Sequence, residues 1–123
     1  GINVILLGGQ ARKGGFELVG PITERLLGDL RADIAFMGAD AIDPESGFYT
    51  TDLGVARVEE LMIRAAERAI VTADASKVGR RAFARYADFS GISAWITSGA
   101  MSPHCKASVQ SLPIDLINVS PEN

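Results

Sequence analysis

The stretch ADIAFMGADAID, residues 32–43, decides the fold class, because a short apolar run ends there on glycine and acidic residues. A second stretch, AIVTADASK at residues 69–77, repeats this arrangement. Short, nearly continuous apolar runs are typical of strands buried in a parallel sheet. Between them, residues 55–69 place apolar side chains at helical spacing. The sequence therefore predicts two parallel strands, at residues 32–37 and 69–73, joined by a helix.

The alternation continues on both sides of this central pattern. We expect further strands at residues 2–7, 92–97 and 114–119, and helices from Pro21 to Leu30 and from Ser102 onward. Strands that alternate with helices form parallel sheets joined by right-handed crossovers. The predicted fold class is therefore α/β, a mostly parallel sheet with flanking helices.

Two longer stretches interrupt the alternation. Residues 39–52 are rich in turn formers and residues 75–90 in basic side chains, so both are predicted to be irregular connections. Trp95 and Phe36 fall within strands and are expected in the core. The last residues, 120–123, are expected to form a frayed end. A length of 123 residues suits a single domain.

Composition excludes several classes of protein. The chain has 12 Lys and Arg against 15 Asp and Glu, a net charge of −3, which is not the footprint of a nucleic-acid binder acting alone. The single cysteine, Cys105, cannot form an internal disulfide, and beside His104 it does not predict a metal site. We find neither an apolar run long enough to span a membrane nor a signal peptide. We therefore expect a cytoplasmic protein without a membrane or metal partner.

Candidate binding residues follow the predicted strands, because ligands of open α/β sheets bind at the carboxyl ends of the strands. Gly8-Gly9 and Gly38 would let backbone approach a ligand, Asp40 and Asp74 would accept hydrogen bonds from hydroxyls, and Lys77 would hold a phosphate. Neither a G-x-G-x-x-G nor a Walker A motif is present, so a nucleotide site is not indicated.

Each candidate also has a purely structural interpretation. Gly8-Gly9, taken alone, is better read as a turn. Asp40 equally suits a turn and Asp74 a cap, and the alternative interpretation of Lys77 is a solvated surface charge. Glu59 and the neighbouring Glu60 suit the early turns of a helix, although one of them could face the cleft.

Together, the quoted motifs resemble a known family. GADAID (38–43), TADASKVGRRA (72–82) and LLGGQARKGGFELVGP (6–21) look like the corresponding segments of the C-terminal sensor domain of the DeoR family of bacterial transcriptional regulators. The resemblance covers about residues 2–97. It implies a domain that senses a phosphorylated sugar or related metabolite and thereby changes DNA binding by an attached helix-turn-helix domain.

The family shares the general fold of ribose-5-phosphate isomerase and the CoA-transferase-like proteins, and a likeness to the isomerase is visible here too. MGADA (37–41), VEE (58–60) and DASK (74–77) match its conserved runs, which places Glu59 on its base. However, Met37 replaces its first aspartate, and its Gly-rich, Lys-bearing segment is missing. We therefore expect a non-enzyme without a cofactor. The alternatives are an isomerase-like enzyme that uses Glu59 as base and a structural remnant.

The resemblance also sets expectations about the site and its partners. The family's DNA-binding region and its first β-α-β portion have no match here, so residues 1–123 are expected to be a partial sensing domain that contacts DNA only through a further domain. A homo-oligomer is also expected. Glu59 falls where the family usually carries a lysine. The expected ligand-binding residues are Gly8, Gly9, Gly38, Asp40, Glu59, Asp74, Ser76 and Lys77.

Overall fold

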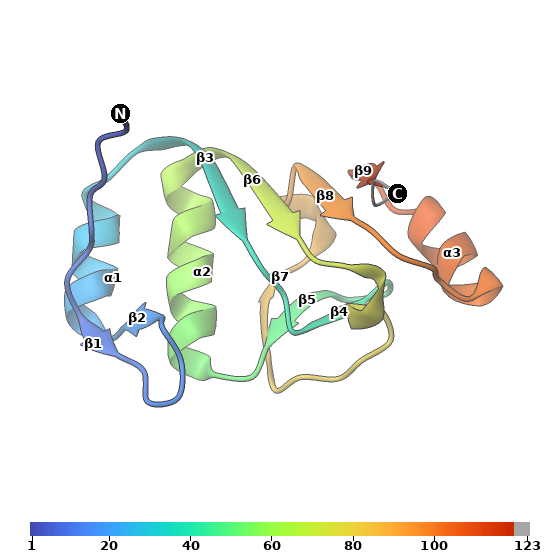
Figure 1. The fold of residues 1–123 in the computed structure, drawn as a ribbon, viewed down its shortest axis with the longest axis horizontal. Helices are drawn as coiled ribbons and strands as arrows, with labels where there is room; N and C mark the ends of the chain where they lie inside the picture. Colours follow the sequence, from blue (N-terminus) through green and yellow to red (C-terminus); the bar gives the residue numbers. More distant parts are fainter. Residues whose placement is uncertain (120–123) are drawn as a thin grey trace.

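The computed structural model describes residues 1–119. Three α-helices and nine short strands alternate along this part of the chain (Figure 1). The helices are α1 (Pro21–Gly28), α2 (Leu53–Ala65) and α3 (Pro103–Gln110), with 3-10 turns η1 (Ala75–Lys77) and η2 (Phe89–Gly91). The strands are β1 (Gln10–Ala11), β2 (Leu18–Val19), β3 (Ala32–Met37), β4 (Ala41–Asp43), β5 (Gly47–Thr50), β6 (Ala66–Thr72), β7 (Ala84–Ala87), β8 (Ala94–Thr97) and β9 (Asp115–Asn118).

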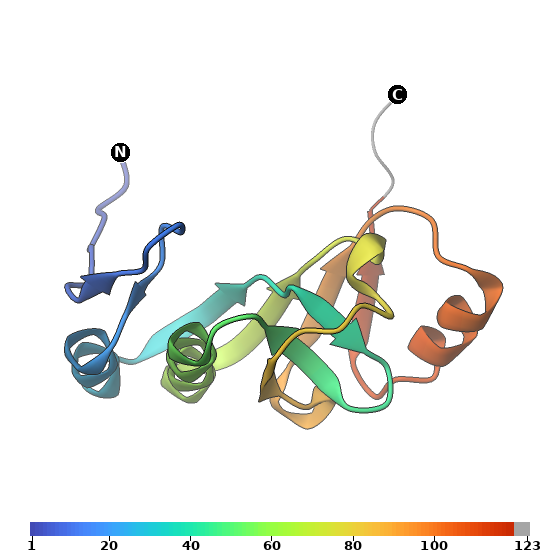
Figure 2. The ribbon, with the colours of Figure 1, turned by 90° about the horizontal axis from the view of Figure 1, so that it is seen from below.

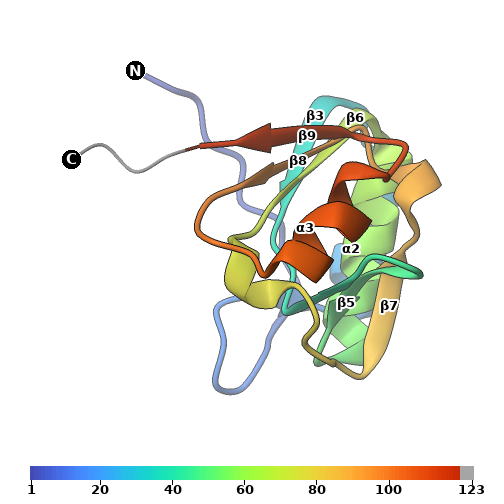
Figure 3. The ribbon, with the colours of Figure 1, turned by 90° about the vertical axis from the view of Figure 1, so that its right-hand side faces the viewer.

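A four-stranded parallel sheet, in the order β3-β6-β8-β9, forms the centre of the molecule. The connection from β3 to β6 runs through β4, β5 and α2, and α2 packs against both β3 and β6. α1 lies beside α2 (Figure 2), and α3 lies on the same side of the sheet as α2 (Figure 3). These observations confirm the predicted α/β class with a mostly parallel sheet and flanking helices.

Residues 39–52 and 75–90 are not merely irregular, as the sequence suggested. They contain β4, β5 and β7, which form a separate antiparallel sheet in the order β4-β5-β7. The turn between β4 and β5 is stabilised by the Asp43 carboxylate, which accepts a hydrogen bond from the Glu45 amide at 2.9 Å. These strands are only three or four residues long, and residues typical of turns surround them. The alternating apolar pattern that predicts a hairpin is therefore too short to recognise in the sequence.

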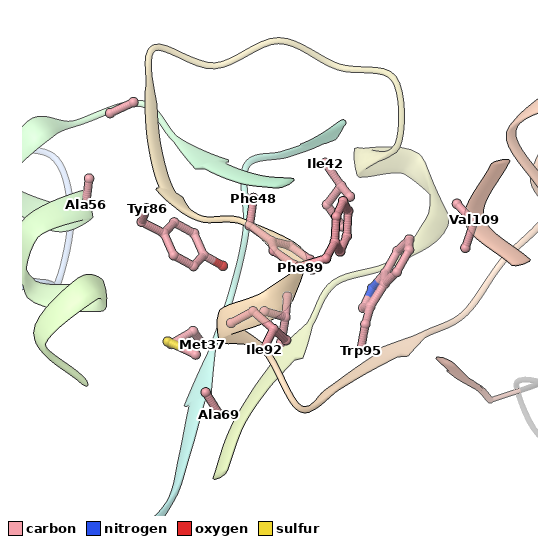
Figure 4. Packing of buried hydrophobic residues seen from close by; sticks show 12 residues of the cluster. Met37, Ile42, Phe48, Ala56, Ala69, Tyr86, Phe89, Ile92, Trp95 and Val109 are labelled. Carbon is pink, nitrogen blue, oxygen red and sulfur yellow. The ribbon is translucent and has the colours of Figure 1, made fainter. Parts of the chain in front are cut away.

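The core lies between the two sheets (Figure 4). Phe48 of β5 is fully buried, and its ring contacts Phe89 edge to face at a centroid distance of 5.0 Å and Trp95 at 6.3 Å. Trp95 is likewise fully buried, and its indole N–H donates to the Ala73 carbonyl at 2.8 Å. The prediction that Trp95 lies in the core is therefore confirmed.

The predicted strand at residues 2–7 is wrong. This segment pairs with no other strand, and its apolar side chains are exposed, Ile2 to 90% and Leu6 to 86%. Phe36 is also not a core residue, because its side chain is 57% exposed. β3 is an edge strand of the sheet, and Phe36 points to the face opposite the buried Met37. An apolar run predicts burial, but within residues 1–119 neither residues 2–7 nor this face of β3 has a partner.

The remaining predicted elements are present with shifted ends. α1 ends at Gly28 and α2 at Ala65, where β6 begins at once, and the last strand is Asp115–Asn118. The predicted Gly-rich connection before α1 contains the small antiparallel pair β1-β2. The expected frayed end at residues 120–123 lies outside the described residues.

Candidate functional site

A cavity of about 780 Å³ lies at the carboxyl ends of β3, β6 and β8. The first two turns of α2 close one side of it through Val55 and Glu59, and the segment before β2 contributes Glu17. Parallel strands bring the residues that follow them to one edge of the sheet, so residues distant in sequence meet there. The polar lining consists of Glu17, Asp40, Thr50, Glu59, Thr72, Asp74, Lys77, Thr97 and Ser98.

Five of the eight predicted binding residues line this cavity. They are Gly38, Asp40, Glu59, Asp74 and Lys77. Gly8 and Gly9 lie elsewhere, against α1, where the Gly8 carbonyl accepts a hydrogen bond from the Thr23 hydroxyl at 2.7 Å. The Ser76 hydroxyl does not line the cavity and instead hydrogen-bonds the Asp74 carboxylate.

Asp40 is held as a hydrogen-bond acceptor. Its Oδ2 accepts from the Thr50 hydroxyl and from the Thr51 amide, both at 3.0 Å. Because these donors come from the end of β5, they fix the carboxylate in the connection between β3 and β4. Asp40 thus fits both the structural and the ligand-binding interpretation, because it stabilises the backbone and also lines the cavity.

Asp74 combines a cap with a place in the cavity wall. Its carboxylate accepts from the Ser76 amide at 2.8 Å and caps η1. The hydrogen bond from the Ser76 hydroxyl lowers the pKa of Asp74 below its ordinary value. The same 3-10 turn carries Lys77, the one basic side chain among the described residues that line the cavity.

Glu59 is a half-buried acid, one oxygen of which has no partner among the described residues. Its Oε2 is shielded from solvent and makes no hydrogen bond to the described residues. Burial, with the nearby charges of Asp40 and Glu17, raises the pKa of Glu59 to about 8. The Glu59 side chain is therefore mostly protonated at pH 7 and can donate a hydrogen bond.

Several polar residues of the site escaped sequence analysis, Glu17 and Thr72 of the cavity lining among them. Thr50 and Thr97 line the cavity, and the buried Tyr86 hydroxyl donates to the Gly38 carbonyl at 2.6 Å, which fixes the backbone at the cavity edge. Threonines are common in strands of every kind, and Tyr86 comes from a strand that was not predicted, so no motif singled them out. Ser98, which directly follows β8, also lines the cavity.

Within residues 1–119, no group of three or more His, Cys, Asp or Glu side chains is arranged to hold a metal ion. None of the helices in the same residues has the length and apolar character that a membrane crossing requires. The four acidic side chains and one lysine among the described lining residues offer hydrogen-bond acceptors for hydroxyl groups and a cation for an anionic group.

A cavity at the carboxyl ends of parallel strands is the usual binding place in the class of small-molecule binding α/β domains, and this fold has such a cavity. Comparison with known proteins then identifies the family. Residues 1–99 match the model of the DeoR C terminal sensor domain, and the chain belongs to this family.

Individual relatives agree with this assignment. The chain is 34% identical over 115 residues to the HTH-type transcriptional regulator GlpR of Haloferax volcanii, a match covering 94% of this chain and 45% of that protein. It is 34% identical over 88 residues to the putative aga operon transcriptional repressor of Escherichia coli O157:H7, covering 72% of this chain and 33% of that protein. It is 26% identical over 90 residues to the glycerol-3-phosphate regulon repressor of Haemophilus influenzae, covering 73% of this chain and 35% of that protein.

These relatives are transcriptional regulators and not enzymes, in agreement with the expectation from Met37. The chain spans less than half the length of each of them. It corresponds to the sensor part of such a regulator.

Proposed function

We propose that the chain is the effector-sensing domain of a DeoR-type transcriptional repressor, and that its cavity binds a phosphorylated sugar or polyol. The observation that carries this proposal is the position of Lys77, the single cation among the described lining residues, in a cavity whose other polar side chains carry carboxyl or hydroxyl groups. Such a cavity offers a charge for the phosphate and hydrogen bonds for the hydroxyls. The names of two relatives, a glycerol-3-phosphate regulon repressor and an aga operon repressor, support this ligand class.

In this proposal, residues 1–123 form a single, partial sensing domain, and operator DNA is bound by a helix-turn-helix domain outside these residues. The ligand acts in the cytoplasm by favouring one arrangement of the regulator. It changes DNA binding only if its affinity differs between the two arrangements. Gly38, Asp40, Glu59, Asp74 and Lys77 would contact the ligand. Gly8, Gly9 and Ser76 would support it indirectly, through the packing of α1 and the orientation of Asp74.

The proposal predicts a specific effect of Lys77→Ala. Removing the cation should raise the Kd for a phosphorylated ligand about ten- to a hundredfold, because hydrogen bonds to charged groups contribute about 1.5–3 kcal/mol. Isothermal titration calorimetry with glycerol 3-phosphate, fructose 1-phosphate and galactosamine 6-phosphate provides the measurement. Binding of the corresponding unphosphorylated compounds should barely change.

Lys106→Ala is the matched control, because Lys106 lies on α3 and does not line this cavity. It should leave the Kd unchanged. Equal losses for phosphorylated and unphosphorylated ligands in Lys77→Ala would contradict the role of Lys77 in phosphate binding. If the wild-type chain binds none of the phosphorylated compounds, the proposed ligand class is wrong.

A further inference from the structure

Two buried side-chain oxygens in residues 1–119 have no hydrogen-bond partner, and both belong to residues that line the same cavity. They are Oε2 of Glu59 on α2 and Oγ1 of Thr97 at the end of β8. Thr97 is only 2% exposed. A buried polar group without a partner costs about 1–3 kcal/mol, so folded proteins rarely leave one. The two atoms belong to different elements, a helix and a strand, that line the same cavity. This coincidence indicates that a ligand supplies the missing hydrogen-bond partners.

The two oxygens differ in what they offer. The Thr97 hydroxyl can donate and accept. Three groups from other elements lie near Glu59. They are Asp40 in the connection after β3, Glu17 in the segment before β2, and the Tyr86 hydroxyl on β7. On its own helix, Arg57 is engaged with Glu24 and Glu60. These surroundings keep Glu59 protonated at neutral pH, so it donates, whereas Asp40 already receives two hydrogen bonds and accepts.

We propose that Glu59 and Thr97 form a subsite that hydrogen-bonds the oxygen atoms of the carbohydrate part of the ligand, while Lys77 holds the phosphate. This inference rests on the proposed function and deepens it. It assigns recognition of hydroxyl or carbonyl oxygens to two residues on separate elements. It requires that both side-chain oxygens turn toward the ligand on binding. A neutral carboxyl group suits an oxygen of the ligand, whereas an ammonium group would require the carboxylate form.

Thr97→Val tests the first half of the subsite, because valine has nearly the same shape without the hydroxyl. The Kd for the phosphorylated ligand that binds the wild type best, among glycerol 3-phosphate, fructose 1-phosphate and galactosamine 6-phosphate, should rise about tenfold. The Kd for inorganic phosphate should not change. The melting temperature without ligand should stay equal or rise, because the variant lacks an unpartnered buried hydroxyl. A merely structural role would instead lower the melting temperature and weaken both ligands alike.

Glu59→Gln tests the second half. In the wild type, the Kd for glycerol 3-phosphate or fructose 1-phosphate, whichever binds better, should rise several-fold between pH 7 and pH 9, as Glu59 loses its proton. Galactosamine 6-phosphate is left out of this series, because its amine titrates in the same range. The phosphate itself stays a dianion over this range. Glutamine still donates but does not titrate, so this variant should bind with a Kd that hardly depends on pH. Glu60→Gln is the control, because Glu60 neighbours Glu59 but does not line the cavity, and it should keep the wild-type pH profile.

The outcomes separate the two proposals. If the wild type binds a phosphorylated ligand and both Thr97→Val and Glu59→Gln leave its Kd and pH profile unchanged, the subsite is wrong and the proposed function stands. If galactosamine 6-phosphate binds best, the number of protons released on binding is measured from the dependence of the binding heat on the buffer. Release of about one proton from Glu59 would show that Glu59 binds the ligand as a carboxylate, and the proposal that it donates a hydrogen bond as a neutral acid would be wrong. If no phosphorylated ligand binds the wild type, the proposed function fails and the subsite with it.

Discussion

The carboxyl group of Glu59 is half-buried near two other acids, Asp40 and Glu17, so its contribution to folding must depend on pH. Its pKa in the folded chain is about 8, above the ordinary value of 4.5. A raised pKa means that the folded state binds the proton more tightly than the unfolded state. The stabilisation is complete below about pH 4.5 and is lost as the pH rises through 8.

Glu59→Gln should therefore remove a pH-dependent loss of stability. Between pH 5 and pH 9 the free energy of unfolding of the wild type should fall, relative to the variant, by on the order of 2–4 kcal/mol, reduced from the full shift because Glu59 is partly exposed to solvent. Urea denaturation of both proteins at several pH values provides the measurement. Parallel pH profiles of the two proteins would show that Glu59 is as well solvated folded as unfolded.

For individual residues, the sequence predicted most of the charged side chains that line the cavity but not its threonines. Asp40, Asp74 and Lys77 follow apolar strands in runs rich in small residues, a pattern that places them at the carboxyl edge of a sheet. Thr97 sits inside the strand pattern itself, and its role depends on a missing hydrogen-bond partner. That absence is a property of packing in three dimensions, which residue order does not encode.

Among the elements, the antiparallel sheet β4-β5-β7 depends on a glycine. Gly47, the first residue of β5, has a φ of 130°, and a Cβ there would lie 2.1 Å from the Ala87 carbonyl oxygen. Gly47→Ala should therefore lower the free energy of unfolding by about 1–3 kcal/mol, through backbone strain and a wider spacing of β5 and β7. Thermal or urea denaturation followed by circular dichroism is the measurement.

Gly28→Ala, in helix α1, is the control for Gly47→Ala. A Cβ at Gly28 meets no atom within 4 Å, and Gly28 is the last residue of α1, where alanine is a better helix former. It should leave stability equal or slightly higher. Equal destabilisation by both substitutions would mean that the close approach at Gly47 is relieved without cost.

The elements that were predicted correctly are the long or strongly periodic ones. α2 shows a helical apolar face, and β3, β6 and β8 are short apolar runs, so their positions follow from local pattern. β4, β5 and β7 have three or four residues each and form only because Phe48 and Tyr86 pack beneath α2 and the sheet. The segment at residues 2–7 shows the reverse case, in which a strand-like pattern lacks a neighbouring strand.

For the whole molecule, the uncovered face of the central sheet is the main unexplained surface. Ile34 and Phe36 on β3 are 42% and 57% exposed, and Ile117 on β9, which the register places on the same face, is 45% exposed. Exposed apolar patches of this kind mark interaction sites. If the expected homo-oligomer forms through this face, a second copy of the chain covers these side chains.

Phe36→Asp should then shift the chain toward the monomer, raising the dissociation constant of the oligomer at least tenfold in sedimentation velocity experiments. A charge placed in an apolar contact must be desolvated, which opposes association. Phe83→Asp is the matched control, because Phe83 is 75% exposed in the connection before β7, away from this face. A wild-type chain that stays monomeric at high concentration would contradict the proposed contact.

α3 and β9 lie beyond residue 99, where the match to the family model ends. Even so, β9 pairs with β8 along its length, and Val109 of α3 is 2% exposed on the side where Trp95 lies (Figure 4). The unit that folds thus extends beyond the boundary of the family model. A chain cut at the family boundary would lose a strand from its sheet and open its largest buried side chain to water.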